Sequence, residues 1–214
     1  MSERYVPAAG RRALTRLYDP AVALTMREAT FRARLRDQVL GGLPDGGCVA
    51  DVGCGTGTLT IALAASGARV IGVDGDPEVL ALARAKAGAD AVQWRNGMAT
   101  ALPLAGATVD RVVMSLLLHH LDAGAKRAAL AEAARVLRPG GRLHVADWGR
   151  PHDPLMRGAA WALERLDGPE GLREHLEGAV PALLADAGFA AVAVHDRLRT
   201  GWGVLELLSA LRLA

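Results

Sequence analysis

Residues 49–60 carry the clearest structural signal in the sequence, Val-Ala-Asp-Val-Gly-Cys-Gly-Thr-Gly-Thr-Leu-Thr. This stretch begins in a predicted strand and ends in a predicted helix, and between them lie Gly53, Gly55 and Gly57. Glycine accepts positive φ and has no side chain, so a ligand can lie directly against the loop backbone. The free N–H groups of the following helix point at the same place. This strand–loop–helix unit predicts a nucleotide-type ligand at the end of the first strand.

Strand and helix patterns alternate along most of the chain. Short apolar runs predict strands at 48–52, 69–74, 91–95, 110–115, 142–147 and 190–198. Helical patterns are found at 59–65, 76–86, 123–137, 155–166 and 172–187. The last apolar run, 202–211, fits a strand or a helix. Alternation of this kind predicts an α/β fold whose mostly parallel sheet is covered by helices on both faces.

Residues 1–42 precede the first predicted strand and carry helical patterning of their own. Asp19-Pro20 separates two short helices, and a basic amphipathic helix follows. Its arginines fit either a solvated face or a lid that contacts a ligand. We predict an N-terminal helical lid over 1–42, which covers a ligand-binding domain at 43–214 and excludes water from it.

Length and composition limit the class of protein. The chain has 214 residues, 51% of them hydrophobic, which suits one domain with a packed core. Its formal net charge of +2 is too small to favour a nucleic-acid partner. The two cysteines, Cys48 and Cys54, suggest neither a disulfide framework nor a metal site. No apolar run approaches the roughly 20 residues of a membrane span, and no signal-peptide pattern occurs. We therefore expect a cytoplasmic protein without an integral membrane segment.

The charges around the glycine loop bear on the identity of the ligand. Asp74 ends the second predicted strand, 21 positions after Gly53, a spacing at which an acidic side chain reaches a ribose diol. The dinucleotide fingerprint needs a glycine where this chain has Thr58. Asp51 would repel a pyrophosphate but attract an ammonium or a sulfonium group. This pattern favours S-adenosylmethionine over NAD.

Further motifs carry a resemblance to a known family. After Asp-Val-Gly-Cys-Gly-Thr-Gly (51–57) and Val-Ile-Gly-Val-Asp (70–74) come Gly-Met-Ala-Thr-Ala-Leu-Pro (97–103), Val-Asp-Arg-Val-Val-Met-Ser (109–115), Leu-His-His-Leu (118–121) and Arg-Val-Leu-Arg-Pro-Gly-Gly (135–141). In this order they resemble the class I S-adenosylmethionine-dependent methyltransferases, in particular the small-molecule branch that includes the ubiquinone/menaquinone biosynthesis methyltransferases. The resemblance covers about residues 45–195 and implies a Rossmann-like, seven-stranded, mostly parallel sheet.

The resemblance also implies which residues bind S-adenosylmethionine. In chain order they are Asp51, Gly53, Gly55, Gly57, Asp74, Gly75, Met98, Ala99, Ser115 and Leu116. The glycine loop would hold the methionine portion, Asp74 the ribose hydroxyls, and Gly75 would lie by the adenine. Met98 departs from the family, which commonly has an aspartate there to accept a hydrogen bond from the adenine amino group. Met98 would instead pack on the ring, while the Ala99 amide recognises an adenine nitrogen.

Candidate catalytic residues follow the fourth and fifth predicted strands, where ligands bind in such sheets. His119 and His120 are adjacent, so we expect at most one of them in the pocket, paired with Asp147 as a base, and no metal. Each of these residues also has a structural interpretation, as a histidine bonded to backbone or as a helix cap. We expect His144 to be satisfied or to face outward, and the remaining histidines, at 152, 175 and 195, to be exposed. Candidate acceptor-lining residues are Tyr18, Arg27, Trp148 and Trp202, with Trp161 a further aromatic candidate.

The sequence thus predicts an enzyme that methylates the oxygen or carbon of a small, partly apolar, quinone-like molecule or secondary metabolite. Two other classes remain open. One is an NAD-type oxidoreductase, which Thr58 and Asp51 disfavour. The other is an S-adenosylmethionine-binding protein without catalysis, acting as a regulatory or assembly partner. The acceptor and the oligomeric state are left open by these motifs.

Overall fold

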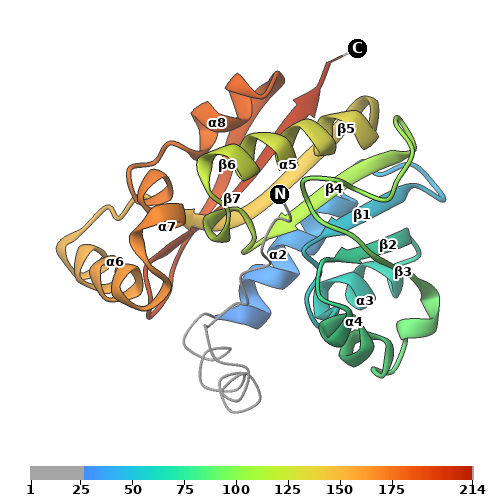
Figure 1. The fold of residues 1–214 in the computed structure, drawn as a ribbon, viewed down its shortest axis with the longest axis horizontal. Coiled ribbons are helices and arrows are strands. Elements are labelled where there is room, and N and C mark those ends of the chain that lie inside the picture. The colour runs from blue at the N-terminus through green and yellow to red at the C-terminus, as the bar shows by residue number, and fades with distance from the viewer. Residues whose placement is uncertain (1–26, 214) are drawn as a thin grey trace.

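A computed structural model describes residues 27–213 as a seven-stranded sheet with helices on both faces (Figure 1). The strands are β1 (Cys48–Val52), β2 (Arg69–Asp74), β3 (Val92–Asn96), β4 (Val109–Ser115), β5 (Leu137–Gly149), β6 (Phe189–Arg199) and β7 (Val204–Arg212). Their order is β3-β2-β1-β4-β5-β7-β6, in which the first five strands are parallel and β7 is antiparallel to both its neighbours. The Rossmann-like fold predicted from the sequence is confirmed.

The topology places a binding edge next to β1. Chain order reverses between β1 and β4, and ligands in such sheets bind outside the carboxyl ends of the strands at this reversal. The motifs that follow β1, β2, β3, β4 and β5 therefore all meet at one edge of the sheet.

Strand β7 resolves the segment that fitted either a strand or a helix. It lies between β5 and β6, and Val204 through Ala210 are all buried. A strand that is buried on both faces reads as a continuous apolar run, because neither side needs polar residues. The tight turn before it is held by Thr200, whose Oγ1 accepts from the Trp202 and Gly203 N–H groups at 3.1 and 3.2 Å.

Helices cover the sheet in two layers (Figure 1). They are α2 (Glu28–Leu40), α3 (Thr58–Ala64), α4 (Pro77–Arg84), α5 (Ala123–Val136), α6 (Pro154–Asp167), α7 (Pro169–Leu176) and α8 (Val180–Asp186), with 3-10 turns η1 (Ala89–Ala91) and η2 (Leu118–His120). One buried apolar cluster joins α5 and α8 to the sheet, and a second joins α2, α3, α6 and α7 to it. None of the helices within 27–213 combines the length and the apolar character that crossing a membrane requires.

Helix α2 corrects the extent of the predicted lid. Its Phe31, Leu35 and Val39 are fully buried in the same cluster as Val49 of β1. Residues 28–40 therefore belong to the layer that covers the sheet. Residues 1–26 of the predicted lid, with Tyr18, lie outside the described residues.

Helix α7 is packed tightly against the turn η2. The helical segment predicted over 172–187 consists of two helices: α7 ends at Leu176, and Pro181, a residue that can start a new helix, lies in the first turn of α8. A Cβ at Gly171 would lie 1.9 Å from the carbonyl oxygen of His119, so only glycine permits this approach. The buried Lys126 of α5 donates to the Gly171 carbonyl and to Glu174 Oε2, both at 2.7 Å. Together these contacts fix α7 over the end of β5.

This packing predicts opposite effects for two helical glycines. Gly171→Ala should lower the free energy of unfolding by about 1–3 kcal/mol, the usual cost of overpacking. Gly158→Ala in α6, where a Cβ meets no atom within 4 Å, is the matched control. It should raise stability by about 0.5–1 kcal/mol, because alanine favours a helix. Urea denaturation measures both; equal effects of the two substitutions would contradict the tight contact.

Candidate active site

The glycine loop after β1 is shaped by its neighbours as well as by its own flexibility. Gly53 and Gly57 have φ of +69° and +74°. A Cβ at Gly53 would lie 2.8 Å from Leu117, and one at Gly57 would lie 2.3 Å from the Trp94 ring. At Gly55, by contrast, a Cβ would meet no atom within 4 Å. The loop therefore packs at its two ends and is open at its middle glycine, where a ligand can approach.

Asp74 joins the glycine loop to the second and third strands. Its Oδ2 accepts the Gly55 N–H at 2.8 Å, and its Oδ1 accepts the Asp76 N–H at 2.9 Å. Its carbonyl oxygen accepts from Asn96 Nδ2 at 2.9 Å and from the Gly97 N–H at 3.0 Å. Each carboxylate oxygen keeps a further lone pair, so Asp74 can still accept hydrogen bonds from a ligand.

Asp51 lies beneath the loop. Only 2% of the residue is exposed, and its Oδ2 accepts from the Thr60 hydroxyl at 2.6 Å. Burial, opposed by the Thr60 bond and helped by the charge of Asp74, raises the pKa of Asp51 to about 6. Asp51 thus places negative charge behind the loop, at a cost to the stability of the fold.

The other predicted cofactor residues lie along the same edge. Gly75 follows β2, and Met98 pairs with Ala101 in an isolated bridge beyond β3, with Ala99 inside that turn. Ser115 ends β4, and Leu116 has a left-handed φ of +53°. Such a conformation is strained for leucine and is frequent at functional sites.

Lys86 was not predicted as part of the site. Its Nζ donates to the hydroxyls of Thr56 and Thr58, both at 2.9 Å. An ammonium group with three donors can hold two oxygens at once, so Lys86 tethers the far side of the glycine loop to the end of α4. No motif signals this contact, because 28 residues separate Lys86 from Thr58.

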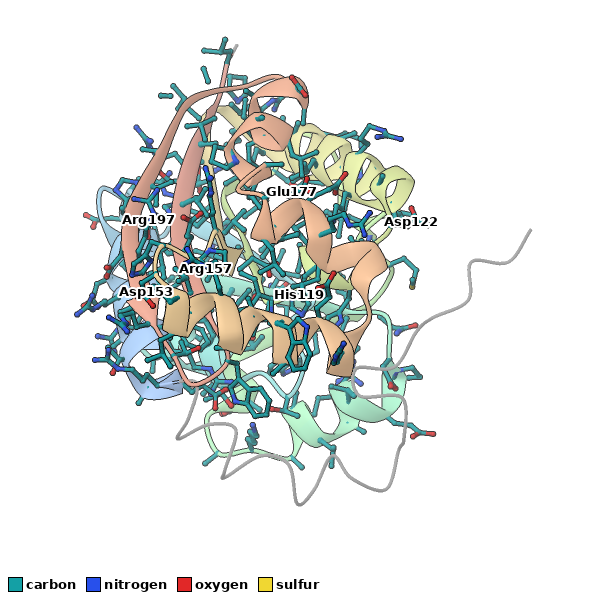
Figure 2. The ribbon with its side chains drawn as sticks, turned by 90° about the vertical axis from the view of Figure 1, so that its left-hand side faces the viewer. His119, Asp122, Asp153, Arg157, Glu177 and Arg197 are labelled. Carbon is teal, nitrogen blue, oxygen red and sulfur yellow. The ribbon has the colours of Figure 1, made fainter. Side chains whose placement is uncertain are left out.

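His119 and Asp147 form a buried pair where β4 and β5 end. His119 Nδ1 lies 2.7 Å from Asp147 Oδ1, and the two side chains are 4% and 0% exposed. A carboxylate oxygen accepts, so Nδ1 donates and Nε2 is left for another partner. Figure 2 shows His119 beside α7. The predicted His–acid pair is therefore made by His119 and not by His120.

Asp147 is held in its ionised form. Its Oδ2 accepts the Leu118 N–H at 2.9 Å, and its Oδ1 accepts the Trp148 N–H at 2.8 Å. Burial alone would raise the pKa of Asp147, but the imidazoles of His119 and His175 and these bonds hold it well below its ordinary value. An ionised carboxylate at Nδ1 favours an imidazole that can take up a proton at Nε2.

His120 lies outside this pair. Its ring rests on that of His119, with centroids 3.9 Å apart, and the residue as a whole is exposed. Partial burial of the ring and the neighbouring His119 lower the pKa of His120. No hydrogen bond of its side chain occurs within the described residues.

The predicted acceptor-lining residues are spread over several environments. Trp148 is buried and meets His119 edge-on, with ring centroids 6.2 Å apart. Trp202 packs against the same apolar cluster as Trp148. Trp161 is 58% exposed beneath Arg165, and Arg27 is exposed at the start of α2. Of the predicted acceptor-lining residues that the structure describes, Trp148 alone therefore contacts the His119–Asp147 pair.

Two histidines lie where the sequence did not predict them. His175, expected to be exposed, is fully buried beside Asp147. It shares the inner face of α7 with Leu172, three positions earlier, and this helical spacing is the signal that could have placed it. His144, expected to be satisfied or to face outward, is buried with no hydrogen-bond partner for either ring nitrogen among the described residues. Burial, with Arg111 and Arg142 nearby, lowers its pKa to about 3.

Comparison with known proteins agrees with the fold described above. A family model described as "Methyltransferase domain" matches residues 49–141. An uncharacterized methyltransferase of Synechocystis sp. is 33% identical over 147 residues, which cover 69% of this chain and 68% of that protein. The ubiquinone/menaquinone biosynthesis C-methyltransferase UbiE of Rubrivivax gelatinosus is 32% identical over 69% of this chain, and the match spans 64% of that enzyme's length.

A solved structure extends the likeness beyond the matched domain. Magnesium protoporphyrin IX methyltransferase from Synechocystis, with bound SAH, superposes with a TM-score of 0.66 and 25% identity. The superposition covers 92% of this chain and 87% of that one. The likeness thus includes strands and helices on both sides of the segment that the family model matches.

Because Asp51 is buried, replacing it with asparagine should raise the free energy of unfolding by an amount that depends on pH. Above about pH 6 the folded chain holds Asp51 ionised and buried, whereas the unfolded chain ionises it freely near pH 4. Asp51→Asn should therefore stabilise the protein at pH 7–8, by up to about 3 kcal/mol for a shift of this size. The gain should shrink as the pH falls from 6 to 4. The exposed Asp45→Asn is the control in thermal unfolding at each pH, and a variant no more stable than wild type at pH 8 would contradict the raised pKa.

Proposed function

We propose that this chain, which belongs to the S-adenosylmethionine-dependent methyltransferase family, methylates a small, partly apolar molecule at an oxygen or carbon that loses a proton. The observation that carries this proposal is the buried His119–Asp147 pair at the carboxyl end of β4 and β5. A base is needed only where the acceptor loses a proton, so the pair favours a phenol, an enol or an activated carbon.

The residues at the edge of the sheet fit the cofactor. Gly55 is open to a ligand, and Asp74 and Asp51 are acceptor-only carboxylates that suit the ribose hydroxyls and the amino group. Ser115 and Leu116 would lie under the sulfonium, and Gly75, Met98 and Ala99 by the adenine. When bound, S-adenosylmethionine supplies a methyl group that leaves its sulfonium sulfur in an in-line displacement.

His119 removes the proton that the acceptor must lose. Its Nε2 accepts the proton as the acceptor's oxygen or carbon forms its bond to the methyl group, and the imidazolium is stabilised by Asp147 at Nδ1. The backbone N–H groups on Asp147 keep the carboxylate aimed at His119 throughout. The products are the methylated acceptor, S-adenosylhomocysteine and one proton, which leaves from Nε2.

The surroundings of His119 support an apolar acceptor. The buried Trp148 meets the ring edge-on, and Leu116 and Trp202 pack in the same cluster as Trp148. The related UbiE enzyme is named for C-methylation in quinone biosynthesis, which supports a quinone-like acceptor here. A small molecule rather than a nucleic acid is thus the proposed partner, and a cytoplasmic location remains a prediction from the sequence.

The role of Asp74 predicts a loss of cofactor affinity. Asp74→Ala should weaken binding of S-adenosylhomocysteine by about 1.5–3 kcal/mol, the range for hydrogen bonds to a charged group. Part of this loss arises because the substitution also removes the acceptor of the Gly55 N–H, which in the wild-type protein is Asp74 Oδ2. Calorimetric titration measures the change, with the exposed Asp90→Ala as the control. Unchanged affinity in Asp74→Ala would show that this carboxylate does not hold the ribose.

The proposed base predicts a difference between adjacent histidines. His119→Ala should lower kcat about 10²–10⁴-fold with cofactor affinity nearly kept, because a general base contributes about that much. His120→Ala is the matched control and should retain most of the activity. Release of S-adenosylhomocysteine with a panel of phenols and hydroquinones measures both. Full activity of His119→Ala would exclude the base, and binding without turnover across the panel would favour the non-catalytic class instead.

A further inference from the structure

Asp147 faces a second imidazole. The Nδ1 of the fully buried His175 lies 3.7 Å from Asp147 Oδ1, the same oxygen that His119 Nδ1 approaches to 2.7 Å. The His119 and His175 rings stand edge to face, with centroids 6.2 Å apart. One carboxylate oxygen thus lies near two histidines that come from different elements, η2 and α7.

The hydrogen bonds define the tautomer of His175. Its Nδ1 lies 3.2 Å from the carbonyl oxygen of Trp148, which can only accept. Nδ1 therefore carries the hydrogen and donates it to Trp148, while Asp147 Oδ1 lies 3.7 Å from the same nitrogen. The other ring nitrogen, Nε2, is buried without a partner among the described residues. Burial lowers the pKa of His175, so this ring is neutral at neutral pH.

Other charged groups near the pair are already engaged. The titratable and charged groups that face Asp147 and its two histidines are His120 of η2, Lys126 of α5, Glu174 of α7 and, across the β5–β7 register, Glu206. Lys126 is bonded to Glu174, and Glu206 is bonded to Arg197 of β6. Among the described residues, His175 is therefore the one basic side chain other than His119 whose nitrogen lies within 4 Å of the Asp147 carboxylate.

We propose that His175 is a positioning residue that sets, through Asp147, how readily His119 takes up a proton. A buried, ionised carboxylate 2.7 Å from His119 favours the protonated form of an imidazole, and a protonated imidazole cannot act as a base. The N–H-bearing Nδ1 of His175, 3.7 Å from the same oxygen, partly offsets the negative charge that His119 faces and so weakens the attraction of Asp147 for a proton on His119. The effect on catalysis rests on the proposed function, since it assumes that His119 is the base.

Removal of the His175 imidazole should therefore increase the affinity of His119 for a proton. In His175→Phe, which keeps an aromatic ring and loses both nitrogens, the pKa of His119 should rise by about 0.5–1 unit, less than the 1–3 units of a full charge at this range. His175→Asn, whose amide N–H replaces the Nδ1 donor, should restore most of the wild-type value. His144→Phe is the matched control, because His144 is also buried on the same strand as Asp147, but the charged groups near it are Arg111, Arg142 and His195.

The experiment is a pH titration of the full chain, labelled with ¹⁵N in its six histidines, by NMR. A His119 pKa that rises in His175→Phe, returns in His175→Asn and stays in His144→Phe supports the proposal. An unmoved or lowered pKa in folded His175→Phe overturns it. If that variant fails to fold, an equal His119 pKa in His175→Asn and His175→Leu overturns it instead.

The acid limb of the kcat–pH profile separates this proposal from the proposed function. Where His119 is the base, the limb should move to higher pH together with the NMR value. A pKa of His119 that moves while the limb stays would sink His119 as the base and leave the influence of His175 on it intact.

Discussion

The structure depends on one buried charge, the carboxylate of Asp147. No part of this residue is exposed, and it accepts hydrogen bonds from the backbone of η2, from its own strand and from His119. An ionised carboxylate is costly to bury unless its oxygens are satisfied. The turn after β4 and the end of β5 must therefore stay together, since separating them would leave the charge with the Trp148 N–H as its one remaining partner among these.

The two lysines of the sequence stabilise the neighbouring parts of this edge in a similar way. Lys126 joins α5 to the start of α7, and Lys86 joins the end of α4 to the glycine loop. In each case one ammonium group donates to two oxygens from a segment that carries site residues. The binding edge is thus fixed from behind by polar contacts, while Gly55 stays open at its front.

The fold could be predicted from local patterns, and its exceptions have physical reasons. The glycine loop, the strand ending in Asp74 and the Ala-rich helix follow directly from spacing and turn chemistry. Strand β7 could not be told from a helix, because burial on both faces removes its alternation. Helix α2 was predicted as part of a lid because charged residues dominate its sequence, and the three apolar side chains that it packs on the sheet form only a narrow stripe.

Site residues at the ends of predicted strands could be expected from the sequence, whereas those that depend on how turns and helices pack could not. The pairing of Asp147 with one of the two adjacent histidines could be expected, because both follow neighbouring parallel strands. The choice of His119 depends on the η2 turn, and the part played by His175 depends on how α7 docks through Gly171. The spacing of His175 from Leu172 could have predicted that it is buried, but no pattern nearby in the sequence predicts that it lies beside Asp147.

A crystal structure of the protein with S-adenosylhomocysteine bound tests this account most directly. The account predicts that Asp74 bonds the ribose hydroxyls and that His119 keeps Nδ1 on Asp147 while Nε2 faces the space beside the sulfur atom. A sulfur atom on the far side of the sheet edge from His119, or a His119 ring closed off from it by α7, would contradict the account.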